Sequence, residues 1–296
     1  MKSSENRILL AVLAHPDDET FGTGGTLAYY ARQGVQVHLV CATRGEVGDV
    51  DERYLRGFAS ISELRQAELR CATEKLGLAG VHFLGYRDSG MPGSPDNQHA
   101  NALAAQPVDQ VAAEVTHYFR LLKPQVVITF DPIGGYRHPD HIAIQRATVR
   151  AFEAGAALRQ EFPNPDDLSP FQPQKLYFQT IPHGLMRLGV TLLRLVGQDP
   201  RHIGRNKDID LVSIAEVDFP THAIIDYRSV AKIRDEASLC HASQGGQEMS
   251  RGPLGWLRRL LFSRETYMRA FPLPVKGITE RDLFEGVRTE FTGCIP

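Results

Sequence analysis

The chain has 296 residues, of which 42% are hydrophobic and 23% charged, as in an ordinary globular protein. A formal net charge of −2 gives no electrostatic reason to expect nucleic acid or an anionic membrane as a partner. The first apolar run is too short for a signal-peptide core or a membrane-spanning helix. We therefore expect a cytoplasmic protein without stable membrane insertion that acts on a small molecule; a homo-oligomer is compatible with the sequence.

The four cysteines are scattered along the chain without a CxxC pair. Such spacing indicates neither a disulfide framework nor a thiolate zinc site. We expect reduced and mostly buried thiols at Cys41, Cys71, Cys240 and Cys294.

The first half of the chain alternates strand and helix patterns. Apolar runs predict strands at 7–14, 35–43, 81–85 and 125–130, and amphipathic or capped segments predict helices at 25–33, 61–78, 108–123 and 139–159. This alternation is typical of βαβ units. The predicted fold class is therefore α/β, with a Rossmann-like, mostly parallel sheet flanked by helices.

The second half is less regular. A strand is predicted at 175–181, after a proline-rich loop. The apolar, arginine-containing segments 185–197 and 253–263 are expected to be core-facing amphipathic helices, although a lid, a membrane contact or an oligomer face would fit the same pattern. We expect a single α/β domain over 1–296, with a core of about 1–185 and a C-terminal elaboration of about 186–296.

Polar loops follow the predicted strands of the first half. HPDDE follows the first strand, TRGEVGD the second, YRDSGMPGSPDN the third and DPIGGYRHPDH the fourth. Ligands of open parallel sheets bind beyond the carboxyl ends of the strands, where these loops should meet. Their acidic and histidine side chains therefore predict a common site.

The glycines in AHPDDETFGTGG first suggest a dinucleotide cradle. A Rossmann fingerprint needs its glycines directly at the strand end, where main-chain amides approach a pyrophosphate. Here three carboxylates occupy that position and would repel an anion. We expect Gly22, Gly24 and Gly25 to permit a tight turn and close helix packing instead.

A metal site is the better interpretation, because the His-Pro-Asp sequence occurs after two different strands. Aspartates that merely cap helices are the alternative. A site with histidine and carboxylate ligands and an open position is typical of catalytic zinc, and neutral imidazole suits Zn²⁺ or Fe²⁺ better than Mg²⁺, which prefers oxygen. Spacing alone cannot select three ligands from the six candidates, which are His15, Asp17, Asp18, His138, Asp140 and His141.

AHPDDE combined with GGYRHPDH resembles the PIG-L/LmbE family of zinc-dependent N-deacetylases. The similarity extends to YRDSGMPGSPDN at 86–97 and to KIRDEASLCHASQ at 232–244, and so covers most of the chain. The length and the RDSGM loop look most like the branch that holds mycothiol-pathway deacetylases and mycothiol S-conjugate amidases. The resemblance implies a hydrolase for an N-acetylglucosaminyl compound, with Zn²⁺, or Fe²⁺ or another divalent metal, as its cofactor.

The resemblance also implies roles for individual residues. The implied metal ligands are His15, Asp18 and His141, and Asp17 is the implied general base. His138 would stabilise the oxyanion or protonate the leaving amine, with Asp140 orienting it, and Tyr136 would be a mobile residue that polarises the amide carbonyl. Arg137, between Tyr136 and His138, stands where the branch of mycothiol-pathway deacetylases is expected to have a small residue.

Substrate contacts are less well defined by the sequence. Glu46, Arg65 and Asp88 lie in or near the loops that follow strands and can bind sugar hydroxyls, and His241 matches a family motif that approaches the site from the C-terminal part. Two other functions stay open. One is an amidase for a larger amide such as a mycothiol S-conjugate, and the other is a non-catalytic sugar-binding module, which would not need Asp17 as a base.

Overall fold

The computed structural model describes residues 7–156, 161–181, 183–203, 209–247 and 263–288. The strands are β1 (Ile8–Leu13), β2 (Gln36–Thr43), β3 (Gly80–Tyr86), β4 (Val126–Thr129), β5 (Lys175–Thr180), β6 (Ala223–Asp226) and β7 (Arg264–Phe271). The helices are α1 (Asp18–Phe21), α2 (Gly24–Arg32), α3 (Ile61–Leu76), α4 (Val108–Leu122), α5 (Gly134–Arg137), α6 (Pro139–Ala156), α7 (His183–Leu195), α8 (Leu211–Ala215) and α9 (Ala231–Cys240).

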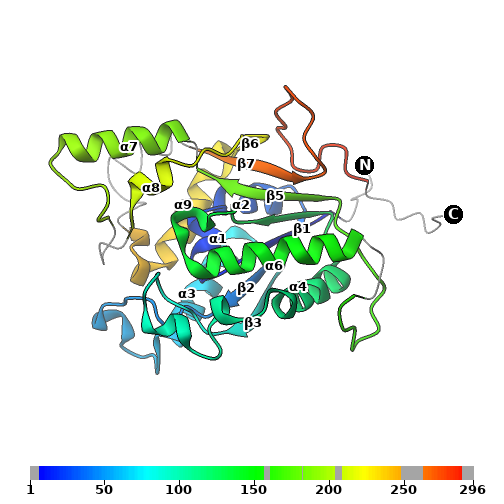
Figure 1. Ribbon diagram of the computed structural model, residues 1–296, viewed down its shortest axis with the longest axis horizontal. Helices are drawn as coiled ribbons and strands as arrows, with labels where there is room; N and C mark the ends of the chain where they lie inside the picture. The colour runs from blue at the N-terminus through cyan, green and yellow to red at the C-terminus, as the bar shows by residue number, and fades with distance from the viewer. Residues whose placement is uncertain (1–6, 157–160, 182, 204–208, 248–262, 289–296) are drawn as a thin grey trace.

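The strands form one seven-stranded sheet in the order β3-β2-β1-β4-β5-β7-β6. β1 to β5 are parallel to one another, and β7 pairs antiparallel with both β5 and β6. Helices α4 and α6 cover one face, and α2, α3 and α9 pack together on the other (Figure 1). The predicted α/β class with a mostly parallel sheet is confirmed.

Burial on both faces explains the local sequence of the central strands. Every residue of β1 is buried, as is every residue of β4. β1 is accordingly a continuous apolar run, and β4 is apolar up to Thr129, without the alternation of a half-exposed strand. Two strands from the C-terminal part, β6 and β7, extend the same sheet. No helix in the described part of the chain is long and apolar enough to cross a membrane.

The expectation for segment 185–197 is wrong in part. The segment forms α7, but Leu188, Leu192 and Leu195 are 52%, 52% and 76% exposed. α7 packs on α8 at the edge of the molecule, so only part of its circumference meets other side chains (Figure 1). The second apolar segment, 253–263, lies outside the described residues except for Ser263.

The expectation of reduced cysteines is also wrong. Cys71 of α3 and Cys240 of α9 form a disulfide with a Cα–Cα distance of 5.7 Å across 169 residues of sequence. The fold packs α3 against α9, a contact between distant segments that cysteine spacing cannot reveal. Cys41 is a free and buried thiol, as expected, and Cys294 lies outside the described residues.

Candidate metal centre and active site

The site lies where the strand order reverses. β1 pairs in parallel with β2 on one side and with β4 on the other, so the loops after β1 and β4 leave the same edge of the sheet as neighbours. His15 to Asp18 follow β1, and the segment from Gly134 to His141 follows β4. Sheet topology therefore brings together two motifs that are more than a hundred residues apart.

Three side chains present ligand atoms to one point. His15 Nδ1 lies 3.2 Å from His141 Nε2 and 3.5 Å from Asp18 Oδ2, and His141 Nε2 lies 3.3 Å from Asp18 Oδ1. Atoms that bind zinc tetrahedrally at roughly 2.0–2.2 Å are about 3.3–3.6 Å apart. The separations and the two-imidazole, one-carboxylate donor set therefore fit a zinc-type divalent ion.

The other nitrogen of each histidine is held by an acceptor. His15 Nε2 lies 3.2 Å from Asp140 Oδ2, and His141 Nδ1 lies 3.2 Å from the main-chain oxygen of Gly134. These contacts assign the protons to His15 Nε2 and His141 Nδ1 and leave the facing nitrogens free. Metal-binding histidines are oriented by such outer contacts in general.

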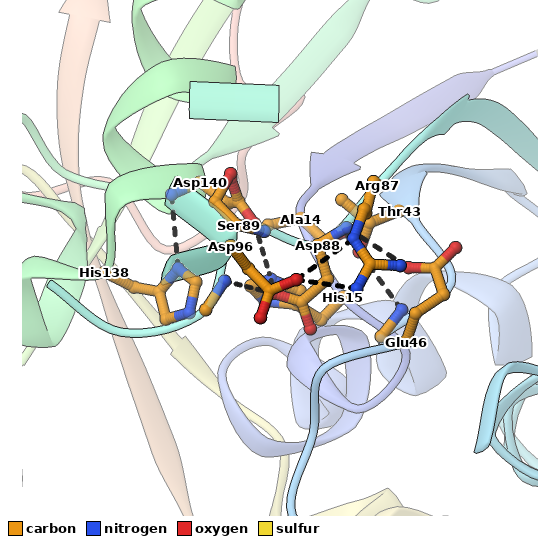
Figure 2. A network of polar contacts seen from close by, with 12 residues as sticks. Ala14, His15, Thr43, Glu46, Arg87, Asp88, Ser89, Asp96, His138 and Asp140 are labelled. Carbon is orange, nitrogen blue, oxygen red and sulfur yellow. Dashed lines mark hydrogen bonds and ion pairs between the residues drawn. The ribbon is translucent and has the colours of Figure 1, made fainter. Parts of the chain in front are cut away.

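Two other groups of possible ligands also contain His15 and His138. One adds His141, and the other adds Asp88 and Asp140, which lie around His15 in Figure 2. Both oxygens of Asp140 are already engaged, since Ser89 donates its main-chain N–H to Oδ2 at 2.8 Å and its hydroxyl to Oδ1. His138 Nδ1 likewise accepts the main-chain N–H of Asp140. The distances and these contacts together favour His15, Asp18 and His141 among the six candidates.

The charges around the site also favour a cation. The side chains of Asp18, Asp88 and Asp140 are 9%, 5% and 0% exposed, so several carboxylates share one buried region. Although burial opposes it, His141 and His15 hold the pKa of Asp18 well below its usual range. Burial would lower the pKa of His15, but Asp88, Asp140 and Asp18 raise it well above its usual value. A divalent ion would compensate this excess of negative charge.

Asp17 sits beside the proposed ligands in a strained turn. Its φ of 125° lies in a region that residues other than glycine rarely adopt. The carboxylate Oδ2 accepts a hydrogen bond from Arg65 Nη2 at 2.9 Å, and the main-chain N–H donates to Glu19 Oε2 at 2.9 Å. Burial raises the pKa of Asp17 to about 6, against the opposing charge of Arg65. A carboxylate with this pKa is suited to accept a proton near neutral pH.

His138 lies at the start of α6. The main-chain N–H of Asp140, one of the free donors of the first helical turn, donates to His138 Nδ1 at 3.2 Å. This bond assigns the proton of the neutral ring to Nε2. Burial, with His15 and His141 close by, lowers the pKa of His138 well below its usual value. The carboxylate of Asp140 contacts His15 and Ser89, so the expectation that it orients His138 is met only through the main chain.

Tyr136 lies in the loop that precedes His138. Its ring centroid is 4.9 Å from that of His141, and burial raises the pKa of its hydroxyl, which stays protonated. Asp131 shapes this loop, because Oδ1 accepts main-chain N–H groups of Ile133 at 3.0 Å and Gly135 at 2.9 Å. Arg137 adopts a φ of 69°. Its guanidinium donates to the hydroxyl and main-chain oxygen of Ser213 in α8.

A cavity of about 660 Å³ opens over these residues. Its wall includes His15, Asp17, Arg65, Asp88, Tyr136 and His138, together with Val47 to Asp49, Gly90, Met91, Ser94, Ile209 and Ser243 to Gly245. The cavity is large enough for an amino sugar with a further group attached.

The sequence profile described as "PIG-L: GlcNAc-PI de-N-acetylase" matches residues 10–152. A relative from Geodermatophilus obscurus is 37% identical over 81% of this chain and 83% of its own, and one from Acidothermus cellulolyticus is 36% identical over 95% of each chain. Both are named 1D-myo-inositol 2-acetamido-2-deoxy-alpha-D-glucopyranoside deacetylase. The chain belongs to the PIG-L family.

Among solved structures, the conserved protein TT1542 from Thermus thermophilus has a TM-score of 0.55 and 23% identity, covering 90% of this chain and 95% of that one. This likeness supports the fold alone. The family resemblance predicted from HPDDE and HPDH is confirmed.

The proposed sugar-binding residues of this PIG-L protein differ in where they lie. Asp88 and Arg65 reach the cavity, but Arg65 is 4% exposed and is bound to Asp17. Glu46 Oε2 accepts the main-chain N–H of Asp88 at 3.2 Å and so supports that loop (Figure 2). His241 is fully buried and does not line the cavity; its Nε2 lies 2.8 Å from Glu19 Oε1. The structure thus places Asp88 and Arg65 at the cavity wall, Arg65 also in contact with Asp17, and Glu46 and His241 in supporting contacts away from the wall.

Sequence reasoning missed three supporting residues. Ser89 holds Asp140, Asp131 shapes the Tyr136 loop, and Glu68 accepts the N–H and hydroxyl of Ser243 at 2.8 and 2.7 Å. Ser89 and Asp131 sit inside loops that the sequence did single out, so their positions were a usable signal. Glu68 lies on the buried side of the helix, in line with Leu64 and Ala72, so a carboxylate at this position of a predicted amphipathic helix was a usable signal as well.

The glycines of the first loop have packing roles. A side chain at Gly25 would lie 2.3 Å from the ring of Tyr227, and one at Gly22 would lie 2.4 Å from Gln179 Oε1. The main-chain N–H groups of Gly25 and Thr26 donate to the carboxylate of Glu265 at 2.9 and 2.7 Å. A protein carboxylate therefore occupies the helix start where a dinucleotide-binding protein would hold a phosphate.

Proposed function

We propose that this chain is a metal-dependent N-deacetylase whose substrate is a GlcNAc-inositol compound of the kind named for its relatives. The observation that carries the proposal is the convergence of His15, Asp18 and His141, next to the cavity that His15 and Asp17 line. Zinc is the proposed ion, and Fe²⁺ is the alternative with the same donor preference. The cytoplasmic location, the single domain and a homo-oligomer stay predictions.

In this proposal, His15, Asp18 and His141 hold the ion, which supplies Lewis acidity and makes water at the site easier to deprotonate. Asp17 accepts the proton of the attacking water. Its carboxylate faces the cavity, and its contact with Arg65 keeps one oxygen in place while the other is free of that bond. General base catalysis of this kind contributes typically about 10²–10⁴-fold in rate.

Two further groups face the place where negative charge develops on the amide oxygen. Tyr136 carries a protonated hydroxyl, and His138 carries its proton on Nε2, the nitrogen that Asp140 does not engage. Donors fixed in place before the reaction stabilise an oxyanion without having to reorient. The leaving amine then takes a proton, which Asp17 holds after the first step.

The test is a deacetylation assay with metal content measured on the same sample. We expect acetate release from the GlcNAc-inositol substrate in proportion to bound metal. Cleavage of a mycothiol S-conjugate with little acetate release would assign the chain to the amidase reaction instead. Protein that binds no metal and releases no acetate after Zn²⁺ is added would leave only the sugar-binding function.

A further inference from the structure

The disulfide between Cys71 and Cys240 connects two helices that both support the proposed base. Cys71 lies on α3 and is exposed, and Cys240 is the last residue of α9 and is half-buried. Structural disulfides are generally protected, whereas exposed ones are the more readily exchanged with external thiols. The pair is therefore accessible to a reductant at Cys71.

Helix α3 supports the side chain of Asp17 directly. Arg65, less than two turns before Cys71, donates to Asp17 Oδ2 at 2.9 Å and lines the cavity. Glu68, on the same helix, binds the N–H and hydroxyl of Ser243. The position of α3 thus affects both the side chain of the base and Ser243 in the cavity wall.

Helix α9 supports the main chain of Asp17 through two intervening residues. His241 directly follows Cys240, and its Nε2 lies 2.8 Å from Glu19 Oε1. The other oxygen of Glu19 accepts the main-chain N–H of Asp17 at 2.9 Å, which holds the residue in its unusual backbone conformation. Ser243 to Gly245, just beyond His241, line the cavity.

We propose that Cys71 and Cys240 form a thiol–disulfide switch. The oxidised pair fixes α3 and α9 together and keeps Asp17 in its productive position; the reduced pair lets the two supports separate and lowers turnover. The proposal rests on the proposed function, because Asp17 matters here as the base of the deacetylation.

Reduction of the Cys71–Cys240 disulfide by thiol–disulfide exchange needs a dithiol. Its thiolate attacks the sulfur of Cys71, the more exposed residue of the pair, the Cys71–Cys240 bond breaks, and Cys240 leaves as a thiolate. The second thiol of the reductant then displaces Cys71 and closes its own disulfide. One disulfide is broken and one formed, two electrons pass from the reductant to the protein, and both cysteines end as thiols.

The experiment compares kcat, KM and bound metal for the oxidised wild type, for the wild type reduced with dithiothreitol, and for the C71S/C240S variant with and without reductant. Reduction should lower the wild-type kcat by about fivefold or more with KM and metal content little changed. The double variant should match the reduced wild type and ignore the reductant. A loss of activity that also occurs in the double variant on adding dithiothreitol would mean metal removal and would overturn the proposal.

Two further measurements separate the switch from other causes. C41A keeps the Cys71–Cys240 pair, so its activity should stay sensitive to reductant; an insensitive C41A would assign the effect to Cys41 and overturn the switch.

Hydrogen exchange in peptides covering 14–23 and 231–246 should be faster in the reduced protein. Unchanged exchange, or faster exchange without a change in kcat, would also overturn it. An oxidised protein without deacetylase activity would contradict the proposed function. The hydrogen-exchange rates of the two peptides would then decide by themselves whether the disulfide controls these segments.

Discussion

The two His-Pro-Asp loops contain the same three residues in opposite arrangements. In the loop after β1, His15 faces the proposed metal and Asp17 faces the cavity, with its side chain 17% exposed. In the loop after β4, His138 faces the cavity, while Asp140 is fully buried behind His15. The same sequence motif therefore provides one aspartate that is placed for catalysis and one that is placed to orient His15.

The backbone causes this difference. Asp17 follows its proline in a strained turn with a φ of 125°. Asp140 follows a proline that begins α6, where proline is favoured and the side chains are fixed by helix geometry. The helix carries Asp140 towards Ser89 and presents His141 one residue later to the proposed ion. Motif letters predict a site, but backbone conformation assigns the roles.

The largest expected effect comes from the ligand supplied by the second loop. His141→Ala removes one of three proposed ligand atoms and leaves Asp18 facing an empty space, so the protein should lose bound metal and with it essentially all activity. Metal content of the purified variant and its acetate release measure this. A His141→Ala variant that keeps stoichiometric metal would favour the other group, His15, Asp88, His138 and Asp140.

Asp17→Asn should lower kcat by about 10²–10⁴-fold while metal stays bound. The amide keeps the size of the carboxylate and can still accept the bond from Arg65, but it cannot take up a proton. Turnover and metal content of the same preparation provide the measurement. Near-wild-type turnover would remove Asp17 from the role of base.

The Asp140→Asn variant should show the reverse pattern and is the matched control for Asp17→Asn. It weakens the contact of Asp140 with His15 Nε2, which orients the proposed ligand. Loss of such an outer contact typically costs about 10–100-fold in metal affinity or activity. Because the base is intact, added Zn²⁺ should restore most of the turnover. A variant that stays inactive at saturating metal would mean that Asp140 acts in the chemical step itself.

The sequence predicted the first half of the fold closely because its signals are local. The apolar run before HPDDE became β1 within one residue at each end, and the helix predicted at 108–123 ends where Lys123 and Pro124 stop it. The site was predictable for a related reason, since strand ends of a parallel sheet converge whatever the loops contain.

The features that were missed depend on contacts between distant segments. Pairing of Cys71 with Cys240 and of Glu19 with His241 both require α9 to pack beside α1 and α3, which no local pattern encodes. The exposure of Leu188 and its neighbours on α7 is the same kind of failure. An amphipathic pattern shows that a helix has an apolar side, but not how much of that side the fold covers.

The smallest expected effect concerns Arg65 and sharpens the contrast between the two aspartates. The positive charge of Arg65 favours the ionised form of Asp17 and lowers its pKa, so Arg65→Gln should raise that pKa above about 6. The carboxylate is then protonated at higher pH, and the acid limb of the kcat profile moves to higher pH. Arg65→Lys keeps a charge near Asp17 and should move the profile less.

The pH profile also separates the two interpretations of Arg65. If Arg65 served only to bind sugar hydroxyls, Arg65→Gln would raise KM and leave the pH dependence of kcat unchanged. The contact with Asp17 at 2.9 Å predicts the opposite result. Arg65→Gln should lower kcat, most strongly at low pH, and should change KM little. Asp140 has no arginine partner of this kind in the described structure and is held by Ser89 and His15, so the same pH shift is not expected from Ser89→Ala.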